Sequence, residues 1–268
     1  MCGRYAVTTD PAKLAAEIDA RNEIDPPPSG SSRSAGESSR SADESSRSPS
    51  AVEGNFNVAP TTTVMTVVDR HEHGVPDDIA ARRIRAMRWG LVPSWTKELG
   101  KGPLLINARA ESLAEKPAFR TSLKGKRCLV PMDGWYEWRK GPAGADGKPT
   151  KTPFFMSPED GTRLFMGGLW AAWRPAEARA AGDDSAWVSS MTIITTDAVG
   201  ALRDVHDRMP LIMPFEFWDA WLDPDSPADP ALLRPPSADL VDRISVREVS
   251  PLVNRVSNNG PELLDPVS

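Results

Sequence analysis

Short apolar runs separated by Gly- and Pro-rich turns dominate the chain from residue 55 onward. Runs of this length, rich in β-branched and aromatic residues, predict strands rather than helices. The expected strands are Thr63–Val68, Ile84–Trp89, Leu104–Asn107, Cys128–Asp133, Pro153–Met156, Arg163–Trp170, Val188–Thr195 and Ile244–Val249.

Helical periodicity is confined to short segments. The stretch from Asp10 to Arg21 predicts a helix with Asp10 as N-cap and Pro11 in the first helical position. Further short helices are expected from Asp197, in "DAVGALRDV", and from Pro214, in "PFEFWDAWL", where Phe217, Trp218, Trp221 and Leu222 would face a core. Together the elements predict an α+β fold that is rich in β-structure, with a curved, barrel-like sheet and short flanking helices.

The segment Pro26–Ser50 has a different composition. It contains the repeat SSRSAGE, SSRSADE, SSRSPS, in which no position is apolar enough for a coiled coil. Such a segment cannot bury enough surface to offset its ordering entropy, so we expect a disordered Ser/Arg-rich insert at about 26–50. The polar stretch Gly141–Thr150 is expected to be a surface hairpin loop, and residues 2–268 are expected to form one domain.

Composition limits the classes of function. A net charge of −5 argues against a general nucleic-acid coat protein, although a local basic groove is compatible with it. No stretch approaches the roughly 18 apolar residues that span a bilayer, and the N-terminus lacks a signal-peptide pattern. The two cysteines, Cys2 and Cys128, form no disulfide framework, which favours a reducing cytoplasm. Cys128 lies in the apolar run "CLVPM" and is expected to be a buried core thiol.

The opening "MCGRYAV" places a cysteine where a chain normally frays. If Met1 is removed, Cys2 carries an α-amine and a thiol on adjacent carbons, and such a 1,2-aminothiol can close a five-membered ring on an aldehyde. An ordinary start followed by an incidental cysteine remains the alternative from these residues alone.

Two further stretches carry candidate chemistry. In "INARAES" an extended backbone would point Asn107, Arg109 and Glu111 to one face, and an amide beside a guanidinium can clamp a phosphate. In "DGWYEW" the aromatic setting of Glu137 predicts a raised pKa suited to proton transfer. The simpler interpretations are an Arg–Glu pair on a solvated strand for the first stretch, and a Glu137 at a strand end that is salt-bridged to Arg139 or Lys140 for the second.

Histidines are few. His206 lies in "VHDRMP", which is typical of an ordered loop, and a lone histidine is as compatible with structure as with catalysis. His71 and His73 lie in the polar turn "DRHEHGVP", where metal binding is a weak alternative. The chain has no Gly-rich phosphate loop, HExxH motif or paired CxxC motif, so no metal or nucleotide cofactor is predicted.

Six motifs in order carry a family resemblance: "MCGRY", "FNVAPTT", "MRWGLVPSW", "INARAES", "RCLVPMDGWYEW" and "VHDRMPLIM". The set resembles the SOS response-associated peptidase (SRAP) family of abasic-site processing proteins. The likeness spans Cys2 to about Met213 and weakens toward the end. Thr96 stands where some members carry a second aromatic residue after Trp95, and Ser112 stands where Thr is common.

The resemblance implies a β-rich SRAP fold and a basic groove for single-stranded DNA. It implies that Cys2, after loss of Met1, crosslinks to the ring-opened aldehyde of an abasic site as a thiazolidine. Glu137 and His206 would transfer protons, and the residues expected to contact DNA are Asn57, Asn107, Arg109, Arg4 and Trp95. The expected protein is a monomer in the cytoplasm, associated with the nucleoid when bound to DNA, without a cofactor.

Two other functions remain open at this stage. A thiol peptidase or amidohydrolase would use the same Cys, Glu and His, but on an amide. A non-enzymatic binder of single strands would leave Cys2 without a role.

Overall fold

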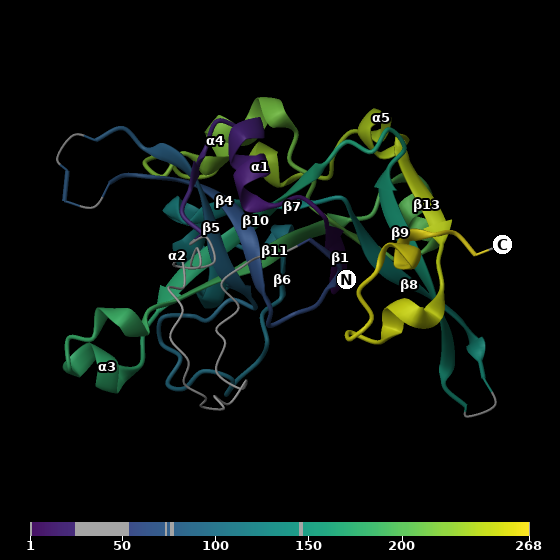
Figure 1. Cartoon of the computed structure of the whole chain (residues 1–268), viewed down its shortest axis with the longest axis horizontal. Coiled ribbons are helices and arrows are strands. Elements are labelled where there is room, and N and C mark those ends of the chain that lie inside the picture. Colours follow the sequence, from purple (N-terminus) through teal and green to yellow (C-terminus); the bar gives the residue numbers. More distant parts are fainter. Residues whose placement is uncertain (1, 25–53, 73, 76–77, 145–146, 268) are drawn as a thin grey trace, which may run out of the picture.

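The computed structural model describes residues 2–24, 54–72, 74–75, 78–144 and 147–267 (Figure 1). The Ser/Arg-rich insert predicted at 26–50 lies outside the described residues. The strands are β1 Arg4–Val7, β2 Arg21–Asn22, β3 Asn55–Val58, β4 Thr63–Arg70, β5 Ala81–Trp89, β6 Asn107–Arg109, β7 Arg127–Met132, β8 Gly134–Ala143, β9 Pro149–Pro158, β10 Leu164–Trp173, β11 Val188–Asp197, β12 Arg208–Pro210 and β13 Ile244–Glu248.

The α-helices are short and lie outside the sheets. They are α1 Pro11–Glu17, α2 Pro117–Gly125, α3 Ala176–Ala180, α4 Trp218–Leu222 and α5 Ala238–Val241. The 3-10 turns are η2 Ala110–Ser112, η3 Asp184–Ala186, η4 Gly200–Asp204, η5 Phe215–Phe217, η6 Pro230–Leu233, η7 Pro251–Asn254 and η8 Pro261–Leu264. No helix in the described parts of the chain has the length and apolar character needed to cross a membrane.

Two sheets organise the molecule. One has five strands in the order β13-β9-β8-β1-β3, and the other follows the order β12-β11-β10-β7-β4-β5-β2. In the second sheet β11 also pairs in parallel with β5, so the run from β5 through β4, β7 and β10 returns to β11 and the sheet is partly ring-like. The predicted β-rich α+β fold with a curved sheet and short flanking helices is confirmed.

Several predicted boundaries were wrong for local reasons. The first helix keeps Asp10 as its cap, with the carboxylate accepting from the Lys13 N–H at 2.9 Å, but it ends at Glu17 instead of Arg21. Asp19 has φ +50°, a left-handed conformation that stops a helix, and Arg21 then enters β2.

The segment Leu104–Asn107 was also misjudged. The strand there is β6 and starts only at Asn107, because Leu105 forms an isolated bridge with Leu91 before it. The expected hairpin loop Gly141–Thr150 is shorter than predicted, since β8 continues to Ala143 and β9 begins at Pro149.

The two later helices are shorter and partly 3-10. The helix expected from Asp197 is the turn η4, while Asp197 ends β11. The helix expected from Pro214 is η5 followed by α4, which buries Trp218, Trp221 and Leu222 as predicted. Phe217 is 43% exposed, which contradicts the prediction that it faces the core. It ends a 3-10 turn, whose tighter winding places it away from the buried face that Trp218 and Trp221 share.

Arg127, at the start of β7, binds backbone carbonyls of α2, of α4 and of the segment that follows α4. Its guanidinium is buried and donates to the carbonyls of Trp221 at 2.5 Å, Leu123 at 2.8 Å and Ser226 at 2.8 Å, among others. A charge-assisted hydrogen bond stabilises the folded state more than a neutral one. Without the guanidinium, buried carbonyls would lose their hydrogen-bond donor, which costs folding free energy.

We therefore expect Arg127→Leu to lower the free energy of unfolding by about 3 kcal/mol or more. Arg120→Leu makes the same chemical change on the exposed side of α2 and should cost under about 0.5 kcal/mol. Urea titrations followed by tryptophan fluorescence measure both. Equal losses in the two variants would show that the carbonyl cluster contributes little.

Candidate functional site

The start of the chain is part of a sheet and does not fray. Strand β1 lies between β3 and β8, and its antiparallel register sets Arg4 opposite Tyr136 and Tyr5 opposite Trp135. Cys2 directly precedes this strand and is fully buried in the main apolar cluster of the described residues. Burial therefore orders the residue that the sequence singled out.

Asn107 fixes the Cys2 backbone. Its Nδ2 donates to the Cys2 carbonyl at 2.7 Å, and its position is set by parallel pairing of β6 with β11, where Asn107 lies opposite Ile193. The Oδ1 of Asn107 is buried and accepts no hydrogen bond from the part of the chain that the structure describes. This buried oxygen, close to the start of the chain, can accept a hydrogen bond from the α-amine or from a ligand.

Glu137 is 3% exposed, and this burial raises its pKa to about 7, against an ordinary value of 4.5. The Asp207 charge raises it further, so Asp207 lies within electrostatic reach of Glu137. Burial also raises the pKa of the Cys2 thiol, to which the Glu137 charge adds. The predicted raised pKa of Glu137 is thus found, together with an electrostatic link from Cys2 through Glu137 to Asp207.

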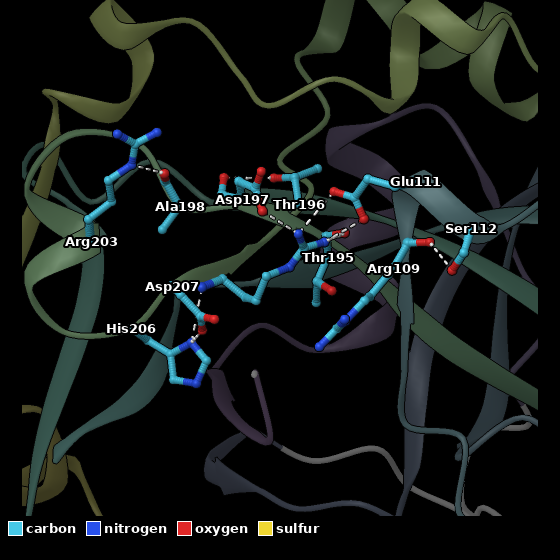
Figure 2. Close-up of polar contacts among 11 residues, drawn as sticks. Arg109, Glu111, Ser112, Thr195, Thr196, Asp197, Ala198, Arg203, His206 and Asp207 are labelled. Atoms are coloured by element: carbon cyan, nitrogen blue, oxygen red, sulfur yellow. Dashed lines mark hydrogen bonds and ion pairs between the residues drawn. The ribbon is translucent and has the colours of Figure 1, made fainter.

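His206 lies between η4 and β12, with its side chain 24% exposed. Its Nδ1 is 2.8 Å from Asp207 Oδ1 and 3.0 Å from the backbone nitrogen of Arg208 (Figure 2). Partial desolvation lowers the pKa of His206, opposed by the Asp207 charge. The ring is therefore largely neutral at pH 7 and can take up a proton from a modestly acidic group.

Arg109 and Glu111 do not share an extended face, which corrects the prediction for "INARAES". The strand ends at Arg109, and residues 110–112 form η2, so Glu111 turns toward Arg208. Arg208 is buried and binds Glu111 at 2.9 and 3.0 Å, Asp197 at 2.5 Å and the Thr195 carbonyl at 2.6 Å. Figure 2 shows the Arg109 guanidinium directed away from this cluster, toward the side on which the His206 ring lies.

Arg4 and Asn57 hold the C-terminal segment. Arg4 donates to Asn57 Oδ1 at 2.7 Å and to the Val253 carbonyl at 2.9 Å. The Asn57 amide donates to the carbonyls of Val253, Arg255 and Asn258. These contacts give both residues a structural role, and their contact with DNA stays a prediction.

Trp95 belongs to a different loop. It is 59% exposed on the rim of a cavity of about 810 Å³ formed by the connection between β5 and β6. The charged residues of this cavity are Arg88, Lys97, Lys101 and Glu98, and Lys101 Nζ lies 3.2 Å from Glu98 Oε2. An exposed indole beside three cations can stack on a base while the cations contact phosphates.

His71 is held in its turn by hydrogen bonds to both nitrogens of its ring. His71 Nε2 lies 2.9 Å from Asp225 and its Nδ1 lies 2.7 Å from the Asp78 carbonyl, so both ring nitrogens have partners. His73 lies outside the described residues. Among those that are described, no group of three His, Cys, Asp or Glu side chains could hold a metal ion.

Comparison with known proteins now decides the family. The sequence model of the family described as "SOS response associated peptidase (SRAP)" matches residues 1–256. The abasic site processing protein YoqW of Bacillus subtilis is 36% identical over 215 residues, which cover 79% of this chain and 85% of YoqW. The chain belongs to the SRAP family.

Other relatives agree with this membership. HMCES of Pongo abelii, also named an abasic site processing protein, is 33% identical over 80% of this chain and 65% of HMCES. In fold alone, a crystal structure of a Bacteroides thetaiotaomicron protein is similar to this chain, with a TM-score of 0.71 at 21% identity over the full length of both chains.

Sequence reasoning on this SRAP protein missed the roles of Asp207 and Arg208. Their charges beside His206 were visible in "VHDRMP", but only the structure shows which atoms they contact. It brings Cys2, Asn107, Glu137 and His206 to one region, with Trp95 on a separate loop.

The raised pKa of Glu137 predicts a pH-dependent penalty on folding. Below pH 4.5 the Glu137 carboxyl is protonated in both the folded and the unfolded state, so its burial does not lower the free energy of unfolding. The loss of stability grows as pH rises above 4.5 and is complete above about pH 7. The full penalty is about 3 kcal/mol. Glu137→Gln should therefore gain stability relative to the parent between pH 5 and pH 8, measured by urea unfolding at each pH. A stability difference that is independent of pH would contradict the buried, titrating carboxyl.

Proposed function

We propose that this protein processes abasic sites in single-stranded DNA by forming a covalent crosslink through Cys2 after Met1 is removed. The crosslink would be a thiazolidine that shields the lesion from strand cleavage. The observation that carries the proposal is the burial of Cys2 next to a carboxyl whose pKa is about 7, with an asparagine fixing the Cys2 carbonyl. Membership in the SRAP family, with relatives named abasic site processing proteins, supports it.

The chemistry begins at the amine. An α-amino group has a pKa of about 7.7–8.0, so a useful fraction is neutral at pH 7 and attacks the sugar aldehyde. Loss of water gives an imine. The Cys2 sulfur then adds to the imine carbon and the imine nitrogen takes a proton, which closes the five-membered ring. Met1 must leave first because an amide nitrogen cannot form the imine.

Burial explains why the amine acts before the thiol. The raised pKa of Cys2 keeps the sulfur protonated, so it is a poor nucleophile until a base removes its proton. Glu137, with a pKa near 7, is suited to accept that proton and to return one to the departing hydroxyl. His206 is suited to protonate the ring oxygen of the closed sugar and so release the aldehyde.

DNA contacts would come from the exposed basic and aromatic residues around this region. Arg109 is exposed and Trp95 stands beside a cavity with three cations, a combination that suits a flexible single strand. The protein would act as a monomer in the cytoplasm and associate with the nucleoid when bound. A weak strand-cleaving lyase reaction would follow from β-elimination at the imine.

Hydrolysis of an amide by Cys2 is the second candidate, favoured by the word peptidase in the family description. It would need the same nucleophile, so substrate decides between the two. If the protein hydrolyses a peptide and forms no adduct with abasic DNA, the amide-hydrolysing function is the correct one.

We expect Cys2→Ala to form no heat-stable adduct with a single-stranded oligonucleotide carrying one abasic site. Cys128→Ala is the matched control, because it removes the other cysteine, which is buried on β7 in the second sheet. This control should crosslink at a rate within about threefold of the parent rate. Denaturing electrophoresis and mass spectrometry detect the product. A stable adduct in Cys2→Ala would refute the proposed linkage.

Arg109→Ala should weaken binding to undamaged single-stranded DNA and lower the slope of log affinity against log salt by about 0.7, the value for one phosphate contact. Arg120→Ala, which removes an exposed arginine on α2, should leave both unchanged. Fluorescence anisotropy at several salt concentrations gives the slopes. If the two variants behave alike, the groove lies elsewhere.

A further inference from the structure

The Nδ1 atom of His206 lies between one donor and one acceptor. The Arg208 backbone N–H is 3.0 Å away and Asp207 Oδ1 is 2.8 Å away. The N–H can bond only to an unprotonated Nδ1, whereas the carboxylate can accept only from a protonated Nδ1. The two contacts therefore belong to two states of the Nδ1 atom, one without a proton and one with a proton.

The backbone that supplies these contacts is held on both sides. The Asp207 carbonyl accepts from the Ala198 N–H at 2.9 Å, and the His206 N–H donates to the Leu202 carbonyl at 3.1 Å. Arg208 is anchored by its ion pairs with Glu111 and Asp197. Because the backbone is fixed, protonation of the ring exchanges partners at Nδ1 with little movement of the chain.

From this geometry we propose that Asp207 is a positioning residue that stabilises the imidazolium form of His206 by accepting from its Nδ1–H, with the second N–H, on Nε2, as the proton donor. In the neutral ring, the Arg208 N–H occupies Nδ1 and the proton stays on Nε2. In the charged ring, Nδ1–H donates to Asp207. Nε2 therefore carries a proton in both states and can serve as the donor. The inference rests on the proposed function for the identity of the reaction that uses this proton.

Other charges act on the same ring. Desolvation, the amino terminus of the chain and Lys140 of β8 lower the pKa of His206, whereas Asp207 and the backbone contact with Arg208 raise it. Glu137 feels the Asp207 charge as well. Asp207 is thus the acidic residue that offsets these effects through direct contact with His206, although its own side chain is 84% exposed.

The test uses the full chain with its Met1 removed and follows the histidine ring nitrogens by ¹⁵N NMR across pH. With three histidines in the sequence, each resonance can be assigned by substitution. We expect the neutral His206 ring to carry its proton on Nε2. Asp207→Asn should lower the His206 midpoint by about 0.5–1 pH unit, and Asp207→Glu should restore most of it. Asp204→Asn, which neutralises an exposed carboxylate one turn earlier, should shift it far less.

Single-turnover crosslinking to abasic DNA supplies the second readout. Above the His206 midpoint, Asp207→Asn should crosslink about threefold to tenfold more slowly than the parent, with the limb of the pH–rate profile moved to lower pH. DNA affinity should be almost unchanged. An unchanged NMR midpoint, or a neutral ring protonated on Nδ1, overturns the inference.

The two proposals fail differently. If the parent forms no adduct while Asp207→Asn still lowers the His206 midpoint, the proposed function falls and the coupling of Asp207 to His206 stands. If the parent crosslinks and Asp207→Asn has the parent's pH–rate profile, the role assigned to Asp207 is wrong.

Discussion

The structure depends on the pairing of β1 with β8. This antiparallel contact draws the first residues of the chain into the five-stranded sheet, with β3 on the other side of β1. Because the strand is paired along both edges, its backbone groups are satisfied and Cys2 can be buried without frayed donors or acceptors. A terminal residue with fixed geometry can hold a reactive pair of groups, whereas a mobile one would lose much of its effective concentration.

Burial shifts the pKa values of the ionisable groups at this site. It raises the pKa of both Cys2 and Glu137, and it lowers the pKa of His206. All three shifts favour the neutral form, as expected where water is partly excluded. In a site whose groups are held neutral, Glu137, with a pKa of about 7, is suited to take up a proton and to give it back near neutral pH.

The second sheet supplies the other half of the site. Strands β6 and β12 both pair with β11, and they carry Asn107 and Arg208. Arg208 is ion-paired with Glu111 and Asp197, and these contacts hold the backbone two residues after His206 in place. Asn107 donates a hydrogen bond to the Cys2 carbonyl, which links the second sheet directly to the residue that precedes β1.

The sequence by itself determined the elements and the chemical types. Short β-rich runs, the cap at Asp10 and the buried tryptophans of "PFEFWDAWL" depend on local periodicity, and local periodicity is set by neighbouring residues. The aromatic surroundings of Glu137 and the six ordered motifs likewise pointed to a raised pKa and to a family before any contact was known.

Only the tertiary structure decided which atoms meet. Glu111 binds Arg208, 97 positions away in the chain, and Asn107 binds the Cys2 carbonyl, 105 positions away. The helix capped by Asp10 ends at Glu17, because the chain becomes left-handed at Asp19. The assumption that "INARAES" stays extended failed because η2 follows β6. Sheet closure and burial are properties of the whole fold, so the partners of His206 and the desolvation of Cys2 could not be obtained from nearest neighbours along the chain.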